Sequence, residues 1–242
     1  MLMKATVLPQ QDAREAGSSC TFCQVRPKAL FGVLPGAHLQ HAPAANTPLS
    51  LEAGQAVYAQ GDTGGAVFTV RRGIVRFERV TSDGECRIVR LAGVGALIGQ
   101  ESLLRAPYAE DAVACTALEI CRIPVDAIDQ HCAQQPALRR ELMRRWQQAL
   151  DAAGEWNAEL ARGQAPRRML KLLDLLRQLS ADGNAIWLPS RQEMGDMLGL
   201  APETASRLVS RFRRSGVLQV ESLTDARVDT RKLADALARA DL

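Results

Sequence analysis

The sequence predicts an α+β protein in which a β-barrel or jelly roll (a β-roll) precedes a long helix and a C-terminal helix-turn-helix module. Three observations support this prediction. Short apolar runs separated by glycine turns fill residues 47–124, apolar residues recur at helical spacing over residues 136–179, and two short amphipathic helices follow in residues 190–216. A chain of 242 residues is long enough for two domains of ordinary size.

These patterns divide the chain into four parts. Residues 1–45 are a polar tail with one short helix expected around Lys28 to Phe31, and residues 46–134 are the β-roll. The long helix covers residues 135–163, and the helix-turn-helix domain covers residues 164–242. Glycine-containing turn signals bound the predicted strands of the roll. The strands are expected at residues 55–59, 66–71, 74–80, 87–91 and 118–123.

The stretch that follows Pro136 predicts a long helix with an apolar seam. Apolar residues recur there at alternating spacings of four and three, which is the pattern of a coiled coil. A helix that packs only on its own domain is the alternative. The seam consists of Leu142, Trp146, Ala149, Ala153, Trp156 and Leu160.

Residues 190–216 predict the helix-turn-helix itself. Ser190 and Glu193 have the spacing of a capping box, which starts the first helix. Gly199 supplies the turn, Pro202 opens the second helix at a position where its missing N–H is tolerated, and Gly216 ends that helix. A core helix over residues 169–179 and a wing over residues 217–228 are expected to complete a winged helix-turn-helix.

The polar side of the second helix predicts contact with DNA. Glu203, Ser206 and Arg207 lie near its N-terminus, where a recognition helix meets base edges in the major groove. Arginine pairs with guanine, glutamate accepts from the cytosine amino group, and serine serves either partner. The alternative is an ordinary two-helix hairpin whose basic side is solvated. The helix caps, the glycine turn, the apolar side and the polar residues of the second helix together favour DNA binding. Three arginines are suited to phosphate contacts: Arg211, Arg213 and Arg214.

Composition limits how the protein can bind DNA, where it is located and what state its cysteines are in. The net charge is only +3, so DNA affinity has to come from local clusters of arginine. The N-terminus lacks the apolar run of a signal peptide, and no segment is long enough to span a bilayer. We therefore expect a cytoplasmic protein without membrane contact, whose six cysteines are thiols, metal ligands or redox groups rather than structural disulfides.

The β-module, the long helix and the segment Glu203–Arg207 (ETASR) together resemble the Crp/Fnr family of bacterial transcription regulators, from Ser18 to the C-terminus. The resemblance is closest to the Fnr branch. It implies a β-roll like that of cyclic-nucleotide-binding domains, double-stranded DNA with TTGAT-like palindromes as the target, and a homodimer that recruits RNA polymerase. Because recognition helices usually work in symmetric pairs, the seam is expected to be the dimer contact.

The resemblance also assigns a role to the cysteines. Fnr-type oxygen sensors hold a 4Fe–4S cluster with three N-terminal cysteines and one internal cysteine; Cys20, Cys23 and Cys121 match, whereas the remaining position is Ala29. Cys115 is the first candidate for the fourth ligand, because it differs from Cys121 by an even number of residues and would share its strand face. The signal would then be oxygen or nitric oxide. Weaker candidates for the fourth ligand are Cys86, Cys132, His131 and a carboxylate. The alternative for Cys115, Cys86 and Cys132, and the one favoured, is a buried free thiol that acts as a small apolar side chain.

Three alternatives to the cluster stay open. In the first, Cys20 and Cys23, or one of them with Cys121, form a disulfide that switches DNA binding. In the second, heme is held by a cysteine or by His38, His41 or His131. In the third, the CxxC serves a redox enzyme or metal carrier, but the chain shows no nucleophile–base pair and no phosphate-binding glycine loop. We therefore expect a regulator and not an enzyme.

The sequence argues against cyclic AMP as the effector. Crp-type pockets hold the nucleotide with a Gly-Glu pair and an Arg-Ser pair. Here Gln100 follows Gly99, and Tyr108–Asp111 occupies the second position with two carboxylates that would repel a phosphate. Arg105 is a counter-charge only if the loop is rearranged.

Overall fold

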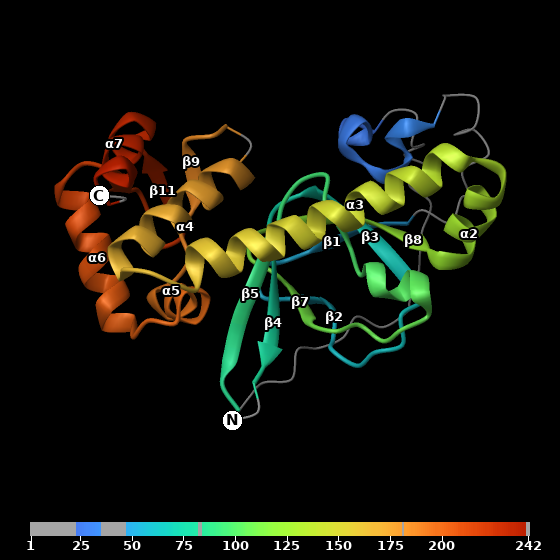
Figure 1. Cartoon of the computed structure of the whole chain (residues 1–242), viewed down its shortest axis with the longest axis horizontal. Helices are drawn as coiled ribbons and strands as arrows, with labels where there is room; N and C mark the ends of the chain where they lie inside the picture. The colour runs from blue at the N-terminus through green and yellow to red at the C-terminus, as the bar shows by residue number, and fades with distance from the viewer. Residues whose placement is uncertain (1–22, 35–46, 82–83, 181, 241–242) are drawn as a thin grey trace. The chain divides into compact units, whose positions relative to one another are not determined.

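The structure is a computed structural model that describes residues 23–34, 47–81, 84–180 and 182–240. The described residues form two compact units. One unit contains the described residues up to Arg79 together with Leu91–Leu150; the other contains Val80–Arg90 and the chain from Asp151 onward. Figure 1 shows the expected α+β order, with strands first, a long helix next and short helices last.

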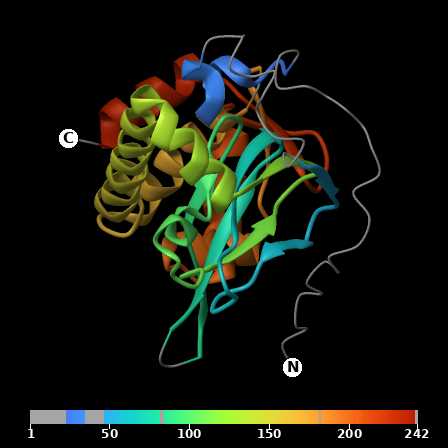
Figure 2. The ribbon, with the colours of Figure 1, turned by 90° about the vertical axis from the view of Figure 1, so that its right-hand side faces the viewer.

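Two four-stranded sheets form a β-roll (Figure 2). The first sheet has the order β1 (Thr47–Leu51), β8 (Leu118–Pro124), β3 (Ala66–Arg72), β6 (Leu97–Ile98). The second has the order β2 (Ala56–Tyr58), β7 (Asp111–Ala114), β4 (Val75–Val80), β5 (Cys86–Ala92). Antiparallel pairing joins β1 to β8 and β3 to both β8 and β6 in one sheet, and β7 to both β2 and β4 in the other.

All five expected strands are present, as β2, β3, β4, β5 and β8. The sequence pattern did not predict β1, β6 and β7. β1 contains Pro48, which has no N–H for a sheet ladder, and the strand accordingly lies at the edge of its sheet. β6 has two residues and β7 has four, so neither is long enough to display an alternating pattern.

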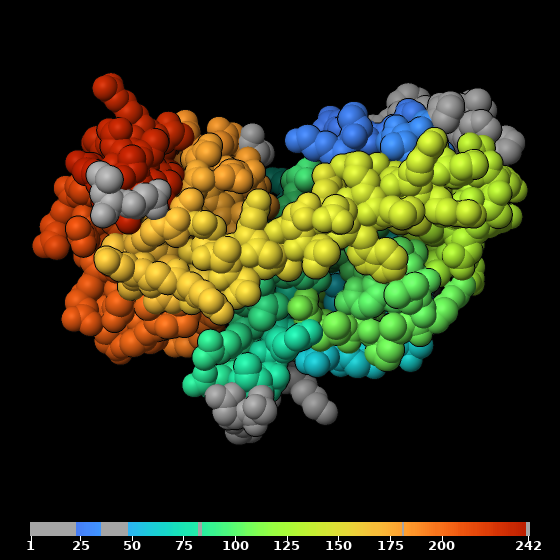
Figure 3. Space-filling view, in the orientation of Figure 1, coloured from blue at the N-terminus to red at the C-terminus, as the bar shows by residue number. Residues whose placement is uncertain are grey.

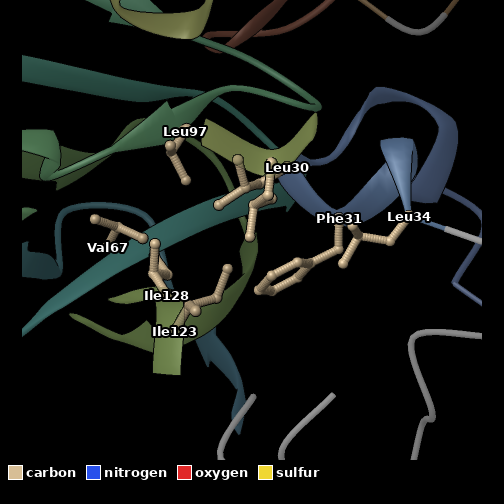
Figure 4. Packing of buried hydrophobic residues seen from close by; sticks show 8 residues of the cluster. Leu30, Phe31, Leu34, Val67, Leu97, Ile123 and Ile128 are labelled. Carbon is tan, nitrogen blue, oxygen red and sulfur yellow. The ribbon is translucent and has the colours of Figure 1, made fainter. Parts of the chain in front are cut away.

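Helices and one apolar cluster hold the N-terminal segment to this roll. Two 3-10 helices, η2 (Arg26–Lys28) and η3 (Leu30–Val33), replace the single short helix expected there. The sequence analysis did not identify α2 (Val125–Gln134), which precedes α3 (Pro136–Glu155). We call the buried residues that join these elements the N-terminal cluster (Figure 4): Leu30, Phe31, Leu34, Val67, Leu97, Ile123, Ile128 and Leu138.

The second unit is a winged helix-turn-helix, as expected. A turn of π-helix, η5 (Trp156–Leu160), follows α3. Strands β9 (Ala185–Trp187), β10 (Leu218–Val220) and β11 (Asp225–Val228) form an antiparallel sheet in the order β10-β11-β9. No helix among the described residues is long and apolar enough to cross a membrane. The helices are α4 (Ala165–Leu179), α5 (Arg191–Leu198), α6 (Pro202–Arg214) and α7 (Thr230–Ala240), of which the last was not predicted.

Candidate nucleic-acid interface

Local geometry fixes the angle between α5 and α6. The Ser190 hydroxyl accepts from the Glu193 amide at 3.2 Å, and the Glu193 carboxylate accepts from the Ser190 amide at 2.7 Å, so the predicted capping box is present. Gly199 ends α5 with φ +60°, a left-handed conformation that favours glycine. A Cβ at Gly195 would lie 2.5 Å from the carbonyl oxygen of Leu200, so the turn also needs a glycine inside α5.

One side of α6 is buried and the other is exposed. The buried side consists of Ala205, Leu208, Val209 and Phe212. Within the exposed side, Arg207 Nη2 donates to the Thr204 hydroxyl at 3.3 Å, one turn earlier in the helix. The side chains predicted to contact DNA are all exposed on α6: Glu203, Ser206, Arg207, Arg211, Arg213 and Arg214.

The rest of the second unit supports this helix. Arg168 of α4 donates from Nη1 to the carbonyl of Leu198 at the end of α5. In the wing, Arg227 of β11 forms a 2.7 Å ion pair with Glu221, which follows β10. The recognition side of α6 is therefore presented by a packed three-helix unit rather than by a free hairpin.

Two of the cysteines in the proposed ligand set, Cys23 and Cys121, lie in or beside the part of the β-roll that contains the N-terminal cluster. Cys20 lies outside the described residues. Cys23 is half-buried just before η2, and Cys121 on β8 is half-buried against the N-terminal cluster. Because Leu30 and Phe31 belong to the same cluster, the segment that follows Cys23 packs on the same apolar core as Cys121. Ala29 lies between η2 and η3, and contributes no thiol there.

The expectation that Cys115 shares a strand face with Cys121 is wrong. Cys115 directly follows β7, in the other sheet, and its amide donates to the Ile74 carbonyl at 2.8 Å. The chain passes from one sheet to the other between β7 and β8. An even spacing places two residues on the same face only when both lie on one strand, so the prediction does not apply here. Cys115 is buried next to a strand of one sheet, whereas Cys121 lies on a strand of the other.

The weaker ligand candidates are also dispersed. Cys86 lies on β5 in the second sheet. Cys132 on α2 packs against the N-terminal cluster, and burial raises the pKa of its thiol, which favours the protonated form. The His131 ring meets the Phe31 ring edge-on at 5.7 Å. Within the described ranges, no three or more His, Cys, Asp or Glu side chains are grouped so that they could hold a metal ion; His38 and His41 fall outside those ranges.

The region that corresponds to a cyclic-nucleotide site is occupied by the protein's own side chains. Tyr108 stacks on Tyr58 with a centroid separation of 3.9 Å, and its hydroxyl donates to the Ala66 carbonyl at 2.7 Å. Arg105 donates to Asp126 at 2.8 Å and to Asp129 at 2.7 Å, both on α2. The one arginine considered for a phosphate is thus paired with two carboxylates.

The predicted seam on α3 is divided between buried and exposed positions. Leu142 packs against the N-terminal cluster, and Leu160 is buried within the second unit. Trp146 is 40% exposed, Ala149 and Trp156 are half-buried, and Ala153 is exposed. The sequence analysis missed Met143 and Leu150, which are 64% and 68% exposed; a heptad shifted by one residue would have found them. We call Met143, Trp146 and Leu150 the α3 stripe.

Comparisons with known proteins give the same two modules. The family model for the cyclic nucleotide-binding domain matches residues 48–135, and that for the Crp-like helix-turn-helix domain matches residues 168–236. A probable transcriptional activator of Rhizobium leguminosarum is 33% identical over 213 residues, or 84% of this chain and 86% of the relative. The transcriptional activator protein FnrA of Stutzerimonas stutzeri is 35% identical over 176 residues, or 71% and 72% of the two chains.

A solved structure agrees in fold. FixK2 from Bradyrhizobium japonicum superimposes with a TM-score of 0.70 at 24% identity, and the match covers 79% of this chain and 96% of that one. The match shows that this chain and that structure share one fold.

Proposed function

The chain belongs to the Crp/Fnr family of transcription regulators, and from this we propose that it binds TTGAT-like palindromes as a homodimer and recruits RNA polymerase in response to oxygen, nitric oxide or redox state. The family consists of DNA-binding regulators and not of enzymes. The observation that carries the proposal is the exposed side of α6, where Glu203, Ser206 and Arg207 lie next to three further arginines. Because its target is chromosomal DNA, we propose a cytoplasmic location.

The chemistry of these side chains suits one half-site per protomer. Arg207 presents a fork that matches the two major-groove acceptors of guanine, and Glu203 accepts from the cytosine amino group. Ser206, the residue before Arg207, serves either partner. Arg211, Arg213 and Arg214 supply phosphate contacts, which add affinity without sequence information.

A binding titration tests this readout. We would compare, at one fixed salt concentration, a duplex with two inverted TTGAT half-sites and a duplex in which both guanines are replaced by adenine. We expect the replacement to weaken binding by about 1–3 kcal/mol for each half-site. Equal affinity for the two duplexes would show that α6 does not read this sequence.

The α3 stripe supports the proposed homodimer. Met143, Trp146 and Leu150 are large, apolar and exposed at spacings of three and four, so they form one line along the helix. A second copy of this line would remove all three side chains from water. Leu142 and Leu160, which the sequence placed in the seam, are packed within their own units, so they would support the helix rather than contact the partner.

The sensing site is proposed at Cys20, Cys23 and Cys121. These residues offer three thiolates, so they fit a 4Fe–4S cluster only if one iron takes a ligand other than cysteine. When bound, such a cluster supplies iron chemistry that responds to oxygen and nitric oxide. The N-terminal cluster of apolar side chains limits the access of water to Cys121. The dithiol switch, with the same three cysteines, stays the second candidate because the described residues contain no group of three or more side chains that could hold a metal ion.

Iron and acid-labile sulfide analysis, with an absorption spectrum, separates these candidates in protein purified without oxygen. About four irons and four sulfides per chain, lost on exposure to air, would support the cluster. Colourless, iron-free protein in which Cys20 and Cys23 titrate with oxidant would establish the dithiol switch. A Soret band would identify heme. Protein that lacks all three properties would contradict sensing at these residues.

A further inference from the structure

A pocket lies beside the wing of the second unit. It is open to solvent and has a volume of about 780 Å³, a size typical of small-molecule sites. Its lining comes from the end of α6, the wing strands β10 and β11, and the first turn of α7. Figure 3 shows the orange residues of α6 and the red residues of α7 at the surface of this unit. We call this site the wing pocket.

Three cationic side chains from three different elements line the wing pocket. Arg213 belongs to the last turn of α6, Arg227 to β11 and Lys232 to the first turn of α7, and all three are exposed. Among the described residues of the lining, Asp229 supplies the one carboxylate. The lining therefore carries more positive than negative charge, which favours an anion as the occupant.

Two of these cations have a carboxylate nearby. Arg227 Nε donates to the Glu221 carboxylate at 2.7 Å, so the two terminal nitrogens of this guanidinium are left for another acceptor. Lys232 Nζ lies 3.9 Å from the Asp229 carboxylate, which is too far for a hydrogen bond. Asp229 itself accepts from the amide of Lys232 at 3.0 Å, at the start of α7.

Arg213 has no carboxylate partner within the part of the chain that the structure describes, and its side chain forms no hydrogen bond there. It follows the buried Val209 by four residues, so it lies at the edge of the exposed side of α6 and not in line with Arg207. Arg211 and Arg214 do not line the pocket. Arg213 is therefore the arginine of α6 whose charge the wing pocket holds without compensation.

Neutral amides add further donors to the same lining. Gln219 of β10 lies directly opposite Arg227 of β11, and both side chains are exposed on one face of the wing sheet. Asn184 lines the pocket as well. A phosphate group offers several acceptor oxygens and matches the planar fork of a guanidinium. Two guanidinium groups, an ammonium and side-chain amides are together the donor set that such a group requires.

We propose that the wing pocket binds the phosphate group of a small molecule, with Arg213, Arg227 and Lys232 as its cationic ligands. A phosphate fills only a part of this volume, so the pocket has room for the rest of the molecule. The occupant would connect the last turn of α6 to the wing and to α7. Neither the cysteines nor the reading of base pairs enters this inference, which therefore goes beyond the proposed function.

Nuclear magnetic resonance on the isotope-labelled whole chain tests the proposal, with inorganic phosphate as the probe. Sodium chloride at equal ionic strength is the reference, because general screening acts on every exposed charge. We expect phosphate to shift the amide signals of Gly216, Gln219 and Lys232 along a saturable curve. We expect the saturable shift to be lost in Arg213→Gln. Lys232→Gln should lose it too, so the test stands if one of the two variants does not fold.

Arg231→Gln is the matched control. It removes the same charge from an exposed side chain of α7 that lies outside the lining, so it should keep the wild-type curve. Shifts that rise without saturation, or that persist in both Arg213→Gln and Lys232→Gln, would overturn the proposal.

A second titration distinguishes a small molecule from the DNA backbone, which is the other source of a phosphate group. The same signals are followed in the complex with a palindromic duplex. A pocket for a small molecule keeps its response to inorganic phosphate in this complex. If the duplex itself shifts these signals and phosphate no longer does, the DNA backbone fills the pocket and the proposal is overturned. Either result leaves the reading of base pairs by Arg207 to its own test.

Discussion

At the scale of single residues, Arg207 carries the proposed reading of sequence. Arg207→Ala is expected to cost about 1–3 kcal/mol in affinity for the palindrome and to relax the preference at one base pair of each half-site. Arg214→Ala is the control, because a phosphate contact weakens binding to all sequences alike and lowers the salt slope by about 1. Both effects are measured by titration over a series of salt concentrations. A uniform loss in Arg207→Ala would place that arginine on phosphate instead.

Removal of two buried hydroxyl groups, those of Thr69 and Ser102, is expected to change the free energy of unfolding in opposite directions. Thr69 is buried on β3, and its hydroxyl has no hydrogen-bond partner within the described part of the chain. Ser102 is fully buried, with its hydroxyl 2.8 Å from the Ala66 carbonyl and 2.7 Å from the Gly99 carbonyl. Thr69→Val should raise the free energy of unfolding by roughly 1 kcal/mol, and Ser102→Ala should lower it by about as much. Urea denaturation measures both, and a destabilised Thr69→Val would show that the hydroxyl has a partner.

At the scale of elements, the turn between α5 and α6 depends on a glycine within a helix. Gly195→Ala places a Cβ against the Leu200 carbonyl, so α6 has to move or α5 has to shift. We expect Gly195→Ala to lower the melting temperature and abolish specific DNA binding, despite the higher helix propensity of alanine. Gln192→Ala, on the exposed side of the same helix, should change stability by only a few tenths of a kcal/mol. Equal effects of the two substitutions would remove the steric argument.

The α3 stripe makes a prediction about assembly. Trp146→Glu introduces a charge into a contact that excludes water, so we expect the dimer to dissociate into folded monomers. Gln148 lies on the opposite side of α3, and Gln148→Glu adds the same charge without touching the stripe. Light scattering after size exclusion measures both variants. An intact dimer in Trp146→Glu would mean that another surface joins the protomers.

The sequence predicted those elements that are long enough to show a periodic pattern of apolar residues or a capping motif. The capping box and the exposed side of α6 follow from local spacing, and the structure reproduces both. Short strands such as β6 carry too little pattern, and the expectation for Cys115 was wrong because the chain changes sheets between β7 and β8. The hydrogen bonds that the Arg145 side chain donates to the carbonyls of Gly95 and Lys28 could not be predicted, because these residues lie 50 and 117 positions away in the chain.

At the scale of the whole molecule, the proposed function divides its tasks between the two units. The first unit holds Cys23, the N-terminal cluster and the α3 stripe, and the second holds the exposed side of α6. A regulator of this kind reads two half-sites only as a pair, because one recognition helix covers a few base pairs. In the proposed function, dimerisation therefore sets the affinity for DNA.

Affinity and stoichiometry can be measured together by fluorescence anisotropy, on a palindromic duplex and on a duplex of equal length with one TTGAT half-site. We expect two chains per palindrome, and binding to the single half-site that is at least about tenfold weaker at the same salt concentration. One chain per duplex, with equal affinity for both duplexes, would contradict the proposal that a dimer reads two half-sites through α6.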